Sequence, residues 1–406
     1  MMYYTRTTKI LRYSLVRILA AALFACARSP ITSTPTRPPY TDVRGTPVSA
    51  SAALLAQEDV VPDELTVRIY THTILAGGEE LPAWTLVSDG LARHDQMEVV
   101  FTVLRGPGEA ASAFPKDLLK FYATLNKLAA NHRLVTPGGM SEFPPSERSL
   151  MGRPDFRGVY YAPGQLIPGV PLVAPFLTAL AITDKEIEQI REFGQVRFLT
   201  GLGLSTGYFP FPPWNDRQRP GGQPLPDSLL NKGFARGTLA GMTVGLELAD
   251  APSTHGTSGP QQIDFTGSRI VLRLAPEFPE MLAETIQAAD AGNTVILFAD
   301  LDVSADGVLA VKPGDESLRV LSCSRQPVAR ISANFVILAP SDEDKDEAFH
   351  AEDGFTVFFR ESTWKRLHEA LADHTPISVP IGDGMTFTVE WLSTRDYSPF
   401  MSYCLK

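Results

Sequence analysis

Apolar and polar residues recur along the chain in patterns that predict both strands and helices. From Asp63 onward, Leu65, Val67 and Ile69 alternate with polar neighbours, as a half-buried strand requires. Further short apolar runs predict strands over 84–87, 99–104, 269–274, 294–299, 355–359 and 385–391. We therefore expect folded structure to begin at residue 63.

Two helices are predicted in the first half of the chain. One opens at Pro115, where the missing N–H costs nothing, and carries an apolar stripe that includes Leu118 and Tyr122. The other begins with a capping box between Thr183 and Glu186 and ends before Gly194. Later apolar patterns predict helices over 278–289 and 363–372, each directly after a strand.

Strands and helices that mix at irregular spacing favour an α+β fold, with mixed sheets and packed helices in two closely associated halves behind an unstructured leader. The aromatic and proline-rich stretch in the middle cannot continue a helix or a central strand, so it predicts the internal boundary. The expected organisation is a leader (1–25), a Ser/Thr/Pro-rich tether (26–62), an N-terminal half (63–207), a connector (208–230) and a C-terminal half (231–406).

The first 41 residues contain no Asp or Glu but several Arg residues, which is typical of an export signal. The apolar run 18–25 is too short to span a membrane and ends at Cys26, in a context that resembles a bacterial lipoprotein box. We expect export, with lipidation at Cys26. An organellar transit peptide and a misassigned start, which would leave the chain cytoplasmic, are the alternatives.

The amino-acid composition and net charge limit the classes of molecule that the chain is expected to bind. The chain has 406 residues, of which 44% are hydrophobic, so it can bury a large core. Its formal net charge of -10 disfavours nucleic acid, and it leaves membrane contact only through the anchor at Cys26. Three cysteines, Cys26, Cys323 and Cys404, make neither a disulfide framework nor a four-thiolate zinc site.

The strongest catalytic candidate is Ser205, within a G-x-S-x-G motif that begins at Gly203. A strand predicted over 196–199 precedes it, but Pro210, Pro212 and Pro213 follow where a nucleophile elbow needs a helix. We interpret the motif as a glycine-rich loop and assign no catalytic residue. A serine hydrolase using Ser205 stays as an alternative.

Metal and cofactor motifs are incomplete. The histidines form no H-E-x-x-H, and the calcium-loop pattern that begins at Asp300 has Val311 where a glutamate should be. Gly201 and Gly203 lack the third glycine and the helix of a dinucleotide fingerprint. We therefore predict neither a metal nor a cofactor.

The connector carries the best candidate for a recognition surface, because aromatic residues and arginine dominate interface hot spots. The candidate binding residues are Tyr208, Phe209, Phe211, Trp214, Arg217 and Arg219. The alternative is that these rings seal the seam between the two halves.

Around this segment the chain resembles the C-terminal region of the endosomal FYVE scaffold proteins, Smad anchor for receptor activation and endofin. The resemblance covers roughly 65–391. The matching residues, in the same order along the chain, are Leu81-Pro82-Ala83-Trp84-Thr85, Asp89-Gly90-Leu91, Glu98-Val99-Val100, Pro115-Lys116-Asp117, Gly169-Val170-Pro171-Leu172, Leu202-Gly203, Tyr208-Phe209-Pro210-Phe211-Pro212, Gln326-Pro327 and Asp353-Gly354.

The resemblance implies a shared fold and a binding role, and it carries over no catalytic residue. Three cysteines cannot build the zinc-binding FYVE finger of those proteins, and the Smad-binding segment has no evident match. We therefore expect a non-enzymatic protein-binding or scaffold module with an unidentified protein partner. A third hypothesis, an immunity-type protein that neutralises a toxin, is motivated by a binding fold with net negative charge.

Overall fold

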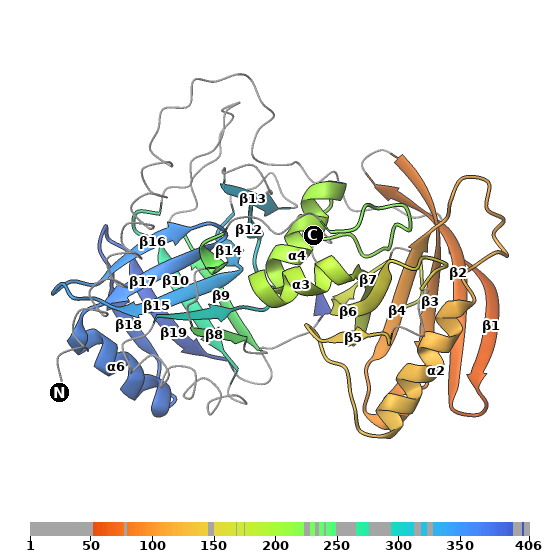
Figure 1. Ribbon diagram of the computed structural model, residues 1–406, viewed down its shortest axis with the longest axis horizontal. Helices are drawn as coiled ribbons and strands as arrows, with labels where there is room; N and C mark the ends of the chain where they lie inside the picture. The colour runs from red at the N-terminus through yellow and green to blue at the C-terminus, as the bar shows by residue number, and fades with distance from the viewer. Residues whose placement is uncertain are drawn as a thin grey trace, which may run out of the picture. The chain divides into compact units, whose positions relative to one another are not determined.

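The computed structural model shows an α+β fold with three mixed sheets and, among the described residues, four α-helices (Figure 1). The described residues are 52–76, 79–144, 150–167, 169–173, 175–222, 228–231, 235–238, 241–248, 265–275, 294–311, 318–322, 328–392 and 400–401. The leader, the candidate anchor Cys26, Cys323, Cys404 and the helix expected over 278–289 lie outside them. The export signal and the anchor therefore stay predictions.

The chain divides into two compact units. Of the described residues, the N-terminal unit holds those of 52–191, 205–222 and 400–401, and the C-terminal unit holds those of 192–204 and 228–392. This division differs from the expected one, because 192–204 joins the C-terminal unit and the predicted connector is split, with 208–222 in the N-terminal unit and 228–230 in the C-terminal unit. The chain therefore passes repeatedly between the two.

The N-terminal unit is built on an eight-stranded sheet in the order β1-β2-β3-β4-β7-β6-β20, with β5 paired to β6. Its strands are β1 (Ala53–Val61), β2 (Leu65–Ala76), β3 (Glu79–Asp89), β4 (Glu98–Leu104), β5 (Met140–Glu142), β6 (Phe156–Gln165), β7 (Phe176–Thr183) and β20 (Phe400–Met401). Two pairs are parallel, β4 with β7 and β20 with β6. The last strand among the described residues thus extends the first sheet.

Strand β1 corrects the expected tether, which was drawn to residue 62. The segment pairs antiparallel with β2, and Asp63 turns the chain between them with a positive φ of 62°. Its residues are mostly exposed or half-buried, because it is the first strand of the sheet. An edge strand needs no strict apolar alternation, so this one has none.

One face of the N-terminal sheet is covered by α2 (Asp117–Ala130), as the stripe from Pro115 predicts. Leu118, Phe121 and Tyr122 pack against the buried alternating positions of β2, β3 and β4. The Tyr122 hydroxyl lies 2.9 Å from Leu86 O, to which it donates a hydrogen bond. The predicted half-buried strand at Leu65 and the predicted helix are both confirmed.

The capping box is also confirmed. Helix α3 (Asp184–Phe193) follows Thr183, whose amide donates to Glu186 Oε2 at 2.8 Å. The Glu186 amide donates back to Thr183 Oγ1 at 3.4 Å. Gly194 then ends the helix with a φ of 85°, in the left-handed region that favours glycine.

The other face of the N-terminal sheet buries a chain of polar side chains. His72 Nε2 lies 2.8 Å from Thr85 Oγ1, which lies 2.9 Å from Thr102 Oγ1. The second imidazole nitrogen, Nδ1, is buried and has no partner among the residues that the structure describes. Burial therefore lowers the pKa of His72 from 6.5 to about 4.

The low pKa of His72 predicts a loss of stability in mild acid. Between pH 6.5 and 4 the unfolded state binds a proton that the folded state rejects, so stability falls as the pH falls. The expected contribution is about 2 kcal/mol lost by pH 5 relative to pH 7.5. Urea unfolding of the wild type and of His72→Gln at both pH values measures it; equal pH dependence in the two proteins would contradict it.

The C-terminal unit contains a seven-stranded sheet in the order β13-β12-β14-β9-β10-β19-β18 and a five-stranded sheet in the order β16-β17-β15-β11-β8. The first consists of β9 (Met242–Glu247), β10 (Arg269–Leu274), β12 (Gly307–Val311), β13 (Leu318–Ser322), β14 (Arg330–Ala333), β18 (Ile377–Pro380) and β19 (Thr386–Trp391). The second consists of β8 (Ala235–Thr238), β11 (Val295–Phe298), β15 (Phe335–Pro340), β16 (Glu347–Ala351) and β17 (Gly354–Phe359). Both contain parallel and antiparallel pairs.

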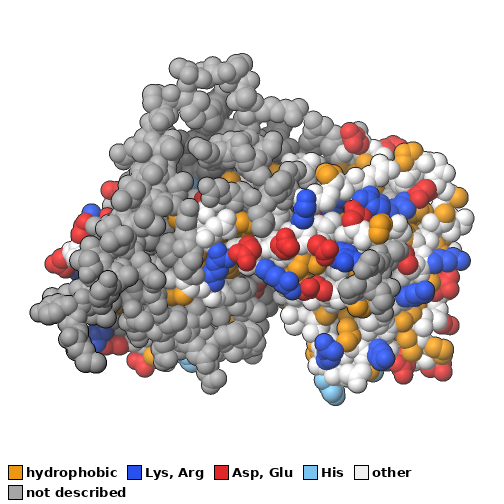
Figure 2. Space-filling view, viewed as in Figure 1, with side chains coloured by type: hydrophobic (Ala, Val, Ile, Leu, Met, Phe, Trp, Pro, Cys, Tyr) orange, Lys and Arg blue, Asp and Glu red, His pale blue; other side chains and the backbone are white. Residues whose placement is uncertain are grey.

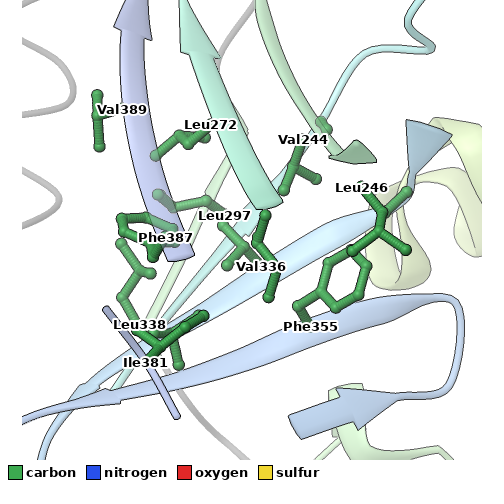
Figure 3. Close-up of a cluster of buried hydrophobic side chains, with 14 of the residues drawn as sticks. Val244, Leu246, Leu272, Leu297, Val336, Leu338, Phe355, Ile381, Phe387 and Val389 are labelled. Atoms are coloured by element: carbon green, nitrogen blue, oxygen red, sulfur yellow. The ribbon is translucent and has the colours of Figure 1, made fainter. Parts of the chain in front are cut away.

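The two sheets share one apolar core, in which Leu272 and Phe387 of the first sheet meet Leu297 and Val336 of the second (Figure 3). Helix α6 (Glu361–Ala372) follows β17 and adds Trp364 to this core, where its ring lies 5.9 Å from that of Phe359. The predicted strands over 269–274, 294–299, 355–359 and 385–391 and the helix over 363–372 are confirmed within two residues at each end.

A buried ion cluster ties α4 (Gln195–Thr206) to the turn between β16 and β17. Arg197 donates through Nε to Asp353 Oδ2 at 2.8 Å and through Nη2 to Glu352 Oε2 at 2.7 Å. The side chain of Asp353 has no exposed surface. Burial disfavours the charge of Arg197, but the two carboxylates outweigh this effect and raise its pKa. The helix is thus held by charge as well as by packing.

No helix among the described residues is long and apolar enough to cross a membrane.

Candidate recognition site

The six residues predicted to bind a partner lie in one segment, residues 208–222, which we call the strap. The strap packs against the sheet of the N-terminal unit and joins it through a bridge between Asn215 and Val103 of β4. Its prolines and glycines prevent a regular element, so side chains rather than a backbone ladder fix most of its course.

The predicted aromatic surface is corrected by the structure. Phe209, Phe211 and Trp214 are only 2%, 0% and 5% exposed, so they form no surface that a partner reaches. Trp214 packs with Ile74 of β2 and stacks edge-on with Tyr208 at 4.8 Å between ring centroids. These rings are buried because the apolar positions on this face of the sheet need a cover.

Asn215 closes a fork in the sheet, where β4 and β7 stop pairing with each other. Its Nδ2 donates to Thr102 O of β4 at 2.9 Å and to Ala179 O of β7 at 3.0 Å. Its Oδ1 accepts a hydrogen bond from the Ala181 amide at 2.7 Å. One side chain thus satisfies backbone groups on both strands.

Arg219 is held in the structure by the capping box. It forms ion pairs with both carboxylate oxygens of Glu186, which is buried, and donates to Ala181 O at 2.6 Å. Its guanidinium carbon also lies 5.2 Å from the ring centroid of Phe156. Arg219 therefore anchors the strap to α3, and we assign it a structural role rather than the predicted binding role.

Arg217 has a different setting, beside a second arginine and a part-exposed carboxylate. The guanidinium carbons of Arg217 and Arg105 lie 5.7 Å and 5.6 Å from the ring centroid of Trp84. Trp84 is fully buried and donates from its indole nitrogen to Ala111 O at 2.6 Å. The ring provides a rigid platform, and arginine stacks well on such a platform.

Glu109 supplies the carboxylate of this site. Its Oε2 accepts hydrogen bonds from Arg217 Nη2 and, at 2.6 Å, from the Gly106 amide. The hydrogen bond from Arg217 is the main reason that the pKa of Glu109 lies below its ordinary value; burial opposes the shift, and the Gly106 amide and Arg105 support it. Glu109 is therefore ionised at neutral pH. We call Arg105, Gly106, Glu109 and Arg217 the guanidinium site.

Sequence reasoning found Arg217 but missed the rest of this site. Arg105 and Glu109 flank a Gly-Pro-Gly turn directly after a predicted strand, and that turn was the available signal. Trp84 was placed in a strand, but no periodicity shows that residues 84, 105 and 217 meet. Charged side chains of both signs intermingle on the described surface in Figure 2, so charge patterning gives little guidance either.

The structure also corrects the setting of Ser205. Residues 195–206 form helix α4, so the strand predicted over 196–199 is wrong, and Ser205 lies in the last turn of the helix. A nucleophile elbow needs a serine on a sharp turn from a strand into a helix. Here the serine lies within the end of a helix, and Gly207 follows the helix with a φ of 69°. The motif is a helix end and not the glycine-rich loop that we expected.

The acidic residues that resemble a calcium loop serve other partners. Asp300 accepts a hydrogen bond from the Gly241 amide at 2.7 Å, and Asp302 pairs with Arg273 at 3.4 Å. No group of three or more potential metal ligands occurs in the part of the chain that the structure describes.

Comparison with protein-family models gives no match for the chain, and comparison with curated proteins gives none either. The resemblance to the endosomal scaffold region therefore stays a prediction that rests on the residues quoted for it.

Proposed function

We propose that the chain is a non-enzymatic protein-binding module, exported and held at an envelope by the lipid anchor predicted at Cys26. The observation that carries the binding role is the guanidinium site, where Arg105 and Arg217 stack on Trp84 beside a single part-exposed carboxylate. Arginine on an aromatic platform is a common anchor of protein interfaces.

The net charge of -10 supports a protein partner over a polyanion. Nucleic acid binds through many phosphate contacts and is attracted by a basic field, whereas this chain has the opposite sign. Two of the arginines at the strap are also matched by carboxylates, since Arg153 pairs with Asp155 and Arg219 with Glu186. We therefore infer that a partner is recognised by directional contacts with a few residues at the strap, and not by a broad positive field.

The serine hydrolase alternative is weakened by the helical setting of Ser205. A fluorophosphonate probe tests it on the same sample as the binding proposal. We expect no labelling of the full chain, and labelling that disappears in Ser205→Ala would overturn the proposal in favour of hydrolysis.

Photo-crosslinking in the native cell tests the binding role directly. p-Benzoylphenylalanine is placed at Gln218, which is exposed in the strap next to Arg217, and in a matched protein at Lys127, which is exposed on α2. We expect light-dependent adducts with a discrete protein from the Gln218 position and none from the Lys127 position. Equal adducts from both positions, or none from Gln218, would contradict a recognition surface at the strap.

A further inference from the structure

The guanidinium site brings two positive charges to one negative charge. Arg217 pairs with Glu109, whereas Arg105 forms no ion pair with any carboxylate among the described residues. Arg105 instead donates from Nη2 to the backbone oxygen of Glu109. The site therefore keeps a positive charge that its own carboxylate does not neutralise.

Each of the two arginines also has one hydrogen-bond donor that is not used. Within the described part of the chain, the Nε atoms of Arg105 and Arg217 are buried and have no partner. Buried donors are satisfied in most proteins, and each exception calls for an explanation. Both nitrogens are part of guanidinium groups that stack on the same Trp84 ring, so the two donors without partners lie at the same site.

Glu109 is attached to the site by its side chain, by the hydrogen bond from Arg105 to its backbone oxygen and by a short turn. The turn Gly106-Pro107-Gly108 carries it, with a φ of 76° at Gly108 and a hydrogen bond of 3.1 Å from the Glu109 amide to Gly106 O. Its side chain is 31% exposed, so solvent reaches the carboxylate. A carboxylate in this position can rotate into water without opening a core.

We propose that Glu109 is an internal stand-in for a carboxylate of the partner protein. When the partner binds, an Asp or Glu side chain takes the place of the Glu109 carboxylate, accepts hydrogen bonds from Arg217 and the Gly106 amide, and engages the free charge of Arg105. Glu109 then turns into solvent. This assignment rests on the proposed binding function and adds the chemistry of the ligand.

The geometry favours a carboxylate over a phosphate. The site already holds a planar carboxylate on a guanidinium donor and a backbone amide, which is the arrangement that arginine offers to such groups. Arg153 donates to Arg217 O and is itself paired with Asp155, so it brings no unpaired charge to the site.

A fluorescein-labelled nonapeptide of alternating Glu and Ala is the probe, and its binding to the full chain is followed by fluorescence anisotropy at low salt. Because Glu109 competes for the same donors, Glu109→Gln and Glu109→Ala are expected to tighten binding about tenfold. Arg217→Gln is expected to abolish binding, and Arg217→Lys, which keeps the charge but loses the planar fork, to weaken it.

Arg191→Gln is the matched control, since it removes the same charge from an exposed ion pair, Arg191 with Glu142, in the same unit. It is expected to leave peptide affinity unchanged. Equal losses of peptide affinity in Arg191→Gln and Arg217→Gln would overturn the proposal that Glu109 stands in for a partner carboxylate. So would unchanged peptide affinity in both Glu109 variants. If the peptide experiment fails in this way but crosslinked adducts form at Gln218, the proposed binding function would stand and only the carboxylate ligand would be rejected.

Discussion

Asn215→Ala is expected to lower the free energy of unfolding of the N-terminal unit by about 3 kcal/mol. The substitution removes the side chain that bonds β4 and β7, and it leaves the Ala181 amide and the Ala179 carbonyl buried without that partner. An unsatisfied buried polar group costs about 1–3 kcal/mol, and two such groups are created here. Asn215→Asp is expected to cost at least as much, because its carboxylate would face two backbone carbonyls.

Hydrogen exchange measured by mass spectrometry on the full chain distinguishes the two units. We expect faster exchange in β4 and β7 of Asn215→Ala and unchanged exchange in the core strands of the C-terminal unit. Asn131→Ala is the control, because its amide donates to Lys127 O at the exposed end of α2. Equal exchange in the two variants would mean that Asn215 does not hold the fork.

Arg197→Ala is the second change with a large expected effect, a loss of about 3–5 kcal/mol in the C-terminal unit. It strands Asp353, which is fully buried, and Glu352 without their countercharge. Arg197→Lys retains the charge but cannot donate to both carboxylates with the same fork, so a smaller loss is expected. Faster amide exchange in β17 measures both effects.

Arg236→Ala provides the control for this cluster. Arg236 pairs with Glu192 in the same unit, but Glu192 is half exposed, so the pair contributes little. We expect a change below about 1 kcal/mol. A comparable loss in Arg236→Ala and Arg197→Ala would contradict the special role of the buried cluster.

Local signals predicted the elements whose causes are local. The capping box at Thr183 and Glu186 fixes the start of α3 through bonds between residues three apart, and the alternation from Leu65 fixes the buried face of β2. Both needed no knowledge of distant contacts. The predicted α+β class followed because enough such elements were correct.

The incorrect predictions share a different cause: the structure of these residues depends on contacts with residues that are distant in the sequence. Residues 196–199 are a short segment of three apolar residues and Arg197, which suits a strand or a helix equally, and their helical burial pattern appears only in the folded unit. The strap rings were expected at a surface, yet the apolar face beneath Trp214 comes from β2 and β3. Trp84, Arg105 and Arg217 meet for the same reason, so the site itself was not predictable.

The path of the chain between the units bears on biosynthesis. The first strands of the N-terminal unit leave the ribosome early, but Asn215 follows only after α4, which begins in the other unit. β20 pairs with β6 only when residues 400–401 have been made. The N-terminal sheet therefore emerges first but is completed last. A nascent chain interrupted between residues 191 and 208 would carry an unfilled fork between β4 and β7.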